Sequence, residues 1–199
     1  MPRRKKTAAT QRCRRLTNQF PRWSPSGEQI AFESNRLGPY TLWTINSDGT
    51  GIQQVLSTFS RMPSWHPSGK VMLYVTAPPG ETQGNEVYTL DLPTGATSRI
   101  TWKDGAKRQP LYSPDGSMVI YQFSRCGPEV WIANPDGTDA KQLTTKGGVD
   151  PAWSPDGTHI VYTRWNIQNN DPENGVLWIL EIETGEEARL TTKWPNTCP

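Results

Sequence analysis

Four copies of one short motif divide this chain into units of similar length. Each copy has an aromatic residue, then Ser or His, Pro, Ser or Asp, and Gly, and a proline stands two residues before the aromatic residue. The aromatic residues are Trp23, Trp65, Tyr112 and Trp153, so that successive copies are 42, 47 and 41 residues apart. A repeat of forty-odd residues that holds four short strands is typical of one blade of a β-propeller.

The residues between the motifs show the alternation of polar and apolar side chains that is expected of half-buried strands. A tight hairpin is favoured by the Asp-Gly pair of the turn at 47–50. No stretch shows a convincing apolar period of 3.6 residues, so we expect no substantial helix. In the first unit the pattern predicts strands at 21–24, 29–34, 40–45 and 53–56, and the other units follow the same order.

A sheet with two apolar faces cannot bury both of them alone, so neighbouring blades must stack. The aromatic residue of each motif is therefore expected to pack between blades. The sequence predicts an all-β fold, a β-propeller made of four four-stranded antiparallel blades, which can be an incomplete ring completed by another copy. The predicted blades cover residues 21–58, 63–102, 110–145 and 151–192.

The repeat is out of phase with the ends of the sequence. Residues 14–17 read Arg-Arg-Leu-Thr, which resembles the last strand of each unit. We therefore expect a spare outer strand at 14–18, a basic tail at 1–13 and a propeller domain at 14–199. Three arrangements stay open: a small closed ring, an open array, or completion by another copy. An open array would expose apolar faces and strand edges, which favours the assembly of two or more copies.

The units follow one consensus order of elements, with substitutions in individual units: Pro-x-Trp-Ser-Pro-Asp-Gly, then Ile-x-Tyr or Phe, then a Trp-containing strand, Asp-Gly and Leu-Thr. Over residues 14–192 it resembles the WD-repeat-like β-propeller repeat of the TolB type. The resemblance implies a propeller. Such propellers occur in the periplasmic translocation protein TolB, where they bind partner proteins, and as the non-catalytic gate domain of prolyl-oligopeptidase-type peptidases. Rings of the TolB type usually have more than four blades.

Positive charge is concentrated at the N-terminus. Seven basic residues and no acidic residue precede Leu16, whereas the whole chain carries 21 basic and 19 acidic residues. A basic tail can bind nucleic acid or an acidic surface. Because no aromatic residue lies among these charges before Phe20 to stack on a base, we expect a solvated tail, and nucleic-acid binding through residues 3–15 is the less favoured alternative.

The sequence places few limits on the compartment. No apolar stretch approaches the ~18 residues that a membrane span needs, and the charged N-terminus is not followed by the apolar segment of a signal peptide. We expect a cytoplasmic protein if the chain is complete as written, and a periplasmic or extracellular one if it is cut from a longer secreted protein. Cys13, Cys126 and Cys198 are too few and too far apart to indicate a metal site or a disulfide scaffold.

No catalytic constellation is recognisable in the sequence. Both histidines, His66 and His159, occupy positions of the repeat, and no G-x-S-x-G, H-E-x-x-H or phosphate-binding loop is present. The aspartates of the turns are explained by hydrogen bonds to their own backbone, and a calcium site built from them is the alternative. We therefore predict that the chain is not an enzyme and binds no cofactor and no metal.

Loops that interrupt the repeat are better candidates, because a rigid scaffold presents binding groups on loops. In a propeller, the connections from the second to the third strand and from the fourth strand to the next blade open on one face. Trp102 and Trp165 lie off the core positions, so they either join a binding surface or cover the ends of the core. The candidate binding residues are Arg36, Tyr40, Trp102, Lys103, Lys107, Arg108, Arg125, Trp165, Asn169, Asn170, Asp171 and Glu173.

These features predict a non-catalytic binding or assembly protein, whose partner is another protein or further copies of itself. Two alternatives come from other classes. One is a gating propeller fragment of a prolyl-oligopeptidase-type serine peptidase, which requires a hydrolase domain beside it. The other is a lectin-like carbohydrate binder, because exposed tryptophan beside arginine or asparagine also suits a sugar surface.

Overall fold

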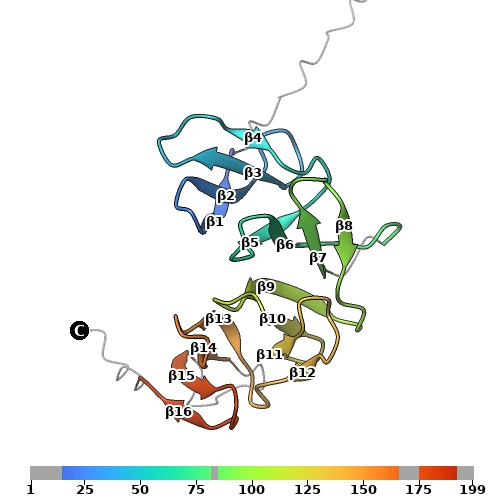
Figure 1. Cartoon of the computed structure of the whole chain (residues 1–199). Coiled ribbons are helices and arrows are strands. Elements are labelled where there is room, and N and C mark those ends of the chain that lie inside the picture. The colour runs from blue at the N-terminus through green and yellow to red at the C-terminus, as the bar shows by residue number, and fades with distance from the viewer. Residues whose placement is uncertain (1–14, 82–84, 166–174, 192–199) are drawn as a thin grey trace, which may run out of the picture.

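The computed structural model describes residues 15–81, 85–165 and 175–191. These residues form sixteen strands in four sheets and contain no helix. Each sheet holds four strands that are consecutive in the chain, and each strand pairs with the next in antiparallel fashion. The predicted all-β fold with four four-stranded blades is therefore confirmed (Figure 1).

Each blade takes its four strands from one repeat unit. The first blade contains β1 (Asn18–Trp23), β2 (Gln29–Ser34), β3 (Thr41–Asn46) and β4 (Gln53–Gln54). The second contains β5 (Arg61–Trp65), β6 (Val71–Thr76), β7 (Glu86–Asp91) and β8 (Thr97–Arg99). The third contains β9 (Ala106–Tyr112), β10 (Val119–Ser124), β11 (Pro128–Ala133) and β12 (Lys141–Gln142). The fourth contains β13 (Val149–Trp153), β14 (His159–Arg164), β15 (Val176–Glu181) and β16 (Glu187–Arg189).

The inner strands differ from the sequence prediction. β1 begins at Asn18, three residues before the predicted start, and it runs through Pro21. Pro21 has no N–H group to donate to the ladder, and the pairing with β2 shifts register between Gln19 and Arg22. A bulge is where a strand tolerates proline, and the same shift recurs in the inner strands of the other three blades.

The residue before each of these prolines has a positive φ. The values are 51° for Phe20, 55° for Met62, 47° for Gln109 and 52° for Asp150. A residue before proline usually adopts the extended region, and bulky side chains avoid positive φ, so the sequence did not indicate this conformation. Because it recurs at one position of all four blades, it belongs to the repeat, where it redirects a side chain at the bulge.

The first described residues do not form the predicted spare outer strand at 14–18. Residues 15–17 have no strand pairing, and β1 already begins at Asn18. An outer strand needs the third strand of its own blade as a partner; here Thr17 instead receives a hydrogen bond on its carbonyl from the Asn35 N–H, at 3.4 Å. Residues 1–14 lie outside the described part, so the tail at 1–13 and the domain at 14–199 stay predictions.

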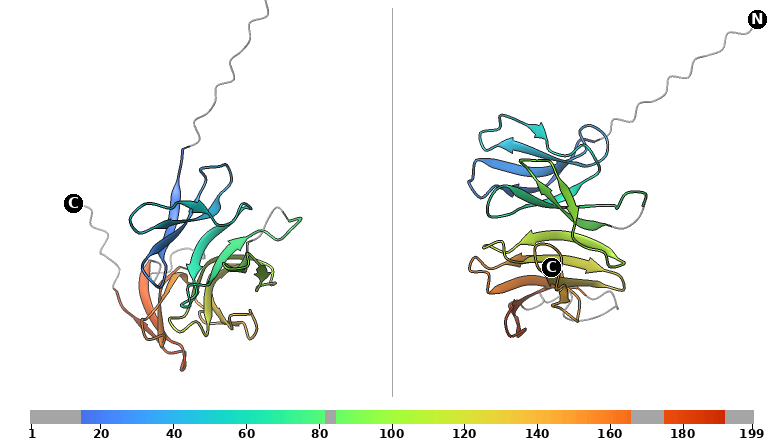
Figure 2. Two further views of the ribbon diagram at one scale, coloured as in Figure 1. Left: turned by 45° about the horizontal axis from the view of Figure 1, so that its top comes forward. Right: turned by 45° about the vertical axis from the view of Figure 1, so that its right-hand side comes forward.

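The blades stack through one recurring contact. Ala31 and Leu42 of the first blade pack against Met72 and Tyr74 of the second. Equivalent apolar residues join the second blade to the third and the third to the fourth. Burying each such side chain contributes roughly 1.5–3 kcal/mol, so the three junctions form the core of the molecule. Figure 2 shows the resulting order of layers in its right-hand view.

The motif aromatics pack at these junctions, as expected, in three of four blades. Trp65 donates its indole N–H to the carbonyl of Arg22 in the preceding blade, at 3.1 Å. Trp153 packs on the third blade in the same way, and Tyr112 meets the ring of His66 edge-on with ring centroids 4.7 Å apart. The expectation is wrong for Trp23, which is 61% exposed. No blade precedes it among the described residues, so nothing in that part of the chain covers it.

The described residues form an open arc and not a closed ring. Among them, no strand of the fourth blade contacts a strand of the first blade. Each blade contacts its neighbours along the chain, as the views in Figures 1 and 2 show. Within the part that the structure describes, the small closed ring is therefore not formed.

The corner aspartates give the fold a defined sensitivity to acid. The Ser154 hydroxyl, and then Thr158, donate to Asp156 and lower the pKa of its carboxyl to about 2. Ser113 and Ser117 lower the pKa of Asp115 to about 2 in the same way. Because the pKa of each carboxyl is lower in the folded chain than its unfolded value of about 3.9, the ionised carboxylates stabilise the fold at any pH above that value. This contribution is lost as the pH falls towards 2.

We therefore expect the urea midpoint of the wild type to fall between about pH 4 and pH 2, the window set by these pKa values. The double variant Asp115→Asn with Asp156→Asn should show a shallower fall over the same range, because asparagine does not titrate. Urea unfolding at pH 4, 3 and 2 measures this. Equal slopes for the two proteins would show that these corners do not contribute.

Candidate binding site

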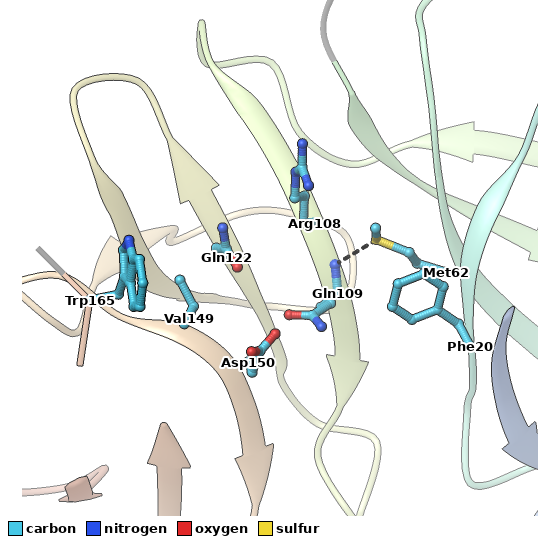
Figure 3. A pocket seen from close by; sticks show the side chains of 8 residues that line it. All are labelled: Phe20, Met62, Arg108, Gln109, Gln122, Val149, Asp150 and Trp165. Carbon is cyan, nitrogen blue, oxygen red and sulfur yellow. Dashed lines mark hydrogen bonds between the residues drawn. The ribbon is translucent and has the colours of Figure 1, made fainter. Parts of the chain in front are cut away.

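A pocket of about 350 Å³ lies where the four inner strands meet (Figure 3). All four bulge residues with positive φ line it, one from each blade. The four side chains that the bulges redirect therefore line one pocket on the axis of the arc, which we call the axial pocket. The lining residues are Phe20, Met62, Arg108, Gln109, Gln122, Val149, Asp150 and Trp165.

The pocket has an apolar side and a polar side. Phe20 and Met62 come from the first two blades, and Met62 is buried among core residues. Gln109 and Asp150 come from the third and fourth blades, and their side chains face one another in Figure 3. Trp165, which follows β14, is 49% exposed beside them. Apolar walls with a few converging polar groups are typical of a ligand pocket.

Arg108 is best understood by comparison with Arg61, which occupies the same position of the preceding blade, four residues before the motif aromatic. Arg61 donates from Nε and Nη2 to Glu33 Oε1 at 3.0 and 2.7 Å. The backbone N–H of Met62 donates to the other oxygen of Glu33 at 2.9 Å. Glu33 is fully buried. The first two blades thus hold a carboxylate between a guanidinium and a bulge N–H group.

The corresponding carboxylate is missing beside Arg108. Val75 stands ten residues after Trp65, where the preceding blade has Glu33 ten residues after Trp23. Arg108 is exposed at the pocket, and its side chain makes no hydrogen bond or ion pair with any described residue. Its guanidinium is therefore free to bind an anion from outside the chain.

Gln109 offers two further groups with weak or no partners. Its backbone N–H donates to the sulfur of Met62 at 3.3 Å, which is a weak acceptor. Its side-chain Oε1 is buried and has no hydrogen-bond partner among the described residues. Buried polar groups without partners are uncommon in folded proteins, so the pocket is suited to a ligand that supplies a hydrogen-bond donor.

Two of the predicted binding residues, Arg108 and Trp165, line this pocket. Arg36 stacks on the Trp43 ring with its guanidinium carbon 4.7 Å from the centroid. The Tyr40 hydroxyl hydrogen-bonds to Thr17 at 2.7 Å, and Arg61 stacks on its ring. Arg36 and Tyr40 are thus engaged in contacts within the first two blades.

Lys107 is not available to a ligand, contrary to the sequence prediction. It is 1% exposed and donates to Glu86 Oε1 at 2.7 Å. Burial lowers the pKa of Lys107, while the hydrogen bond and charge of Glu86 oppose that change. Arg99 also pairs with Glu86, at 3.2 Å. The lysine therefore joins the second and third blades. The burial of its side chain is what separates this structural role from a ligand-binding role.

Three other predicted residues lie apart from the pocket. Trp102 is 61% exposed, so it does not cover the end of the core. Lys103 stacks on the Trp131 ring at 4.0 Å, and Arg125 is exposed on the loop after β10. Asn169, Asn170, Asp171 and Glu173 lie outside the described residues.

Both histidines have local partners. His66 Nδ1 hydrogen-bonds to Ser68 in its corner at 2.8 Å, and His159 Nδ1 to Thr158 at 2.7 Å. Within residues 15–81, 85–165 and 175–191, no three His, Cys, Asp or Glu side chains are grouped to hold a metal ion. The same ranges contain no helix with the length and apolar character needed to cross a membrane.

A family model described as the TolB beta propeller domain matches residues 4–197. The chain belongs to the TolB beta-propeller domain family. A curated relative, the protein TolB homolog of Chlorobium luteolum, is 34% identical over 171 residues, which are 83% of this chain and 37% of the relative. The chain spans half or less of the length of the curated relatives that it matches first.

Solved structures show the same fold. TolB from Acinetobacter baumannii aligns with a TM-score of 0.76 and 26% identity, over 88% of this chain and 44% of that one. The β-propeller domain of the Trilobed protease from Pyrococcus furiosus aligns with a TM-score of 0.61 and 18% identity, over 90% of this chain and 58% of that chain. At that identity the second likeness shows the fold alone.

The four bulge residues of this TolB-type propeller were missed by the sequence prediction. The prolines at 21, 63, 110 and 151 were assigned to the repeat, but not to a bulge in a strand. Proline inside a paired strand indicates a bulge. Each of these prolines could therefore have pointed to the residue before it, which is Phe20, Met62, Gln109 or Asp150.

Proposed function

We propose that this TolB-type propeller is a non-catalytic binding protein whose axial pocket holds an extended, acidic segment of a partner protein. One observation carries the proposal: the Arg108 side chain has no partner among the described residues at the pocket, whereas its equivalent, Arg61, holds a buried carboxylate of the chain itself. A partner carboxylate would make at Arg108 the pairing that Glu33 makes at Arg61.

The other pocket residues support a peptide as the ligand. Phe20, Met62 and Trp165 offer apolar contact to a side chain. The Oε1 of Gln109, which has no partner among the described residues, can accept a backbone N–H of the peptide. Asp150 carries a negative charge on the opposite side of the pocket and therefore disfavours a second acidic group there. The pocket thus favours a segment with one carboxylate near Arg108 and an apolar residue beside it.

The test is a peptide array of acidic, neutral and basic dodecapeptides matched in apolar content. We expect the tightest binders to be acidic, and the Arg108→Glu variant to bind them about 10- to 100-fold more weakly, since a hydrogen bond to a charged group contributes about 1.5–3 kcal/mol. Arg125→Glu is the matched control, because it reverses an exposed arginine outside the pocket. A preference for basic peptides, or equal losses in the two variants, would refute the assignment.

A further inference from the structure

At each end of the arc, one face of the terminal blade is not covered by another described blade. The open face of the fourth blade consists of Ala152, Val161, Leu177, Ile179 and Leu190, which alternate with the residues that pack on the third blade. Leu177 is 41% and Leu190 52% exposed. Their equivalents in the first three blades are covered; Leu42, Val87 and Val130 all have no exposed surface at the position of Leu177.

The face of the first blade that points away from the second carries Trp23, Ile30, Phe32, Trp43 and Ile45. Arg36 lies over the rings of Phe32 and Trp43, which are each 7% exposed, so Trp23 is the open part of this face. Its equivalents in the second blade include Met72 and Tyr74, which are buried against the first blade. Trp23 is the most exposed member of this face, at 61%. A large exposed tryptophan at the edge of an apolar face indicates an interaction surface.

These two open faces are complementary, because each is one half of a junction that the chain forms three times. In each of the three junctions, the face equivalent to the open face of the fourth blade packs on the face equivalent to the open face of the first blade. Within the described part of one chain, the first and fourth blades do not contact each other. The missing half of each junction can therefore come from a second copy.

One pair of polar positions at the edge of these faces is compatible with such a contact. In the junction of the first and second blades, Glu33 faces Arg61. At the end of the arc the equivalent positions are Thr163 on the fourth blade and Gln19 on the first. Both are neutral, so a second copy would not leave an unpaired charge buried at this point.

One specific hydrogen bond is available to the contact. Trp65 and Trp153 donate their indole N–H groups to the carbonyls of Arg22 and Leu111, each one residue before the aromatic residue of the preceding blade. The equivalent carbonyl of the fourth blade belongs to Ala152, which is exposed. The exposed Trp23 of another copy is the matching donor.

We propose that a second copy of this chain docks head to tail, with its Trp23 on Ala152 and its first blade against the open face of the fourth blade. This inference concerns the ends of the arc and is independent of the axial pocket. The contact joins two different surfaces, so two copies can close on each other or further copies can add in series.

Sedimentation velocity over a range of concentrations tests this. The wild type should show a mass of at least twice that of the chain, and both Trp23→Asp and Leu177→Asp should reduce it to a single chain. Trp102→Asp, which changes an equally exposed tryptophan away from both faces, should assemble like the wild type. Arg108→Glu should also assemble normally, which separates this contact from the axial site.

Mixing the two defective variants gives the decisive result. Trp23→Asp keeps its fourth-blade face, and Leu177→Asp keeps its first-blade face, so an equimolar mixture can form one intact junction and should recover a two-chain species. Two misfolded proteins would not complement each other, and thermal unfolding of each variant checks this. A wild type that is a single chain at every concentration, or a mixture that stays monomeric, would overturn the proposal.

Discussion

Replacing Leu42 with alanine is expected to lower the free energy of unfolding by about 2–5 kcal/mol, whereas Leu177→Ala should lower it by less than about 1 kcal/mol. The two leucines occupy the same position of the repeat. The backbone carbonyl of each accepts a hydrogen bond of 2.8 Å from a backbone N–H, that of Val55 for Leu42 and that of Leu190 for Leu177. They differ in what covers them. Leu42 is fully buried beneath the second blade, and Leu177 is 41% exposed.

Urea unfolding measures the difference, and both changes should be made in the Trp23→Asp background. That background keeps copies apart, so that Leu177 is not covered by another chain during the measurement. The slope of the unfolding transition should be the same in all variants, because the surface exposed on unfolding hardly changes. Equal losses at the two positions would mean that the fourth blade is covered within a single chain, against the open arc.

Arg61→Val is expected to destabilise the chain by about 3 kcal/mol, the lower end of the cost of breaking a buried ion pair. The variant leaves the carboxylate of Glu33 fully buried without its cation. The remaining donor to Glu33 among the described residues is the backbone N–H of Met62, at 2.9 Å. A single neutral hydrogen bond does not offset the desolvation of a charge.

An uncharged pair elsewhere in the chain indicates a second substitution that should restore the stability of this variant. In the junction of the third and fourth blades, Gln122 and Val149 stand at the positions of Glu33 and Arg61. The double variant Glu33→Gln with Arg61→Val reproduces that uncharged pair, and it should recover most of the stability that Arg61→Val loses. Urea unfolding of the wild type, the single variants and the double variant completes the cycle. Losses that simply add would contradict the proposed coupling.

The repeat made most of this fold predictable. The strands at 29–34, 86–91, 159–164 and 176–181 coincide with the alternating segments, because one face of each is buried by a neighbouring blade. The inner strands were less predictable, since proline and positive φ weaken the alternation that marks a strand. The exposure of Trp23 depends on what lies beside the first blade, which periodicity within a blade does not encode.

The candidate site was only partly predictable. Arg108 and Trp165 fall in connections between the strands predicted from the repeat, and the structure places both at the pocket. Lys107 resembles Arg108 in the sequence as a basic residue in the same connection. Its ion pair with Glu86, 21 residues away in the chain, joins two blades instead. The bulge residues come together on the axis from positions more than forty residues apart, so their meeting depends on the stacking of the blades.

Hydroxyl-radical footprinting of the tryptophans tests the central claim, that four stacked blades leave one complementary junction unfilled. In dilute solution Trp23 and Trp102, which are both 61% exposed, should be oxidised at similar rates, and Trp43, at 7%, much more slowly. As the concentration rises, Trp23 should become protected while Trp102 does not. If Trp23 is protected at every dilution, or reacts like Trp102 at every concentration, the account is contradicted.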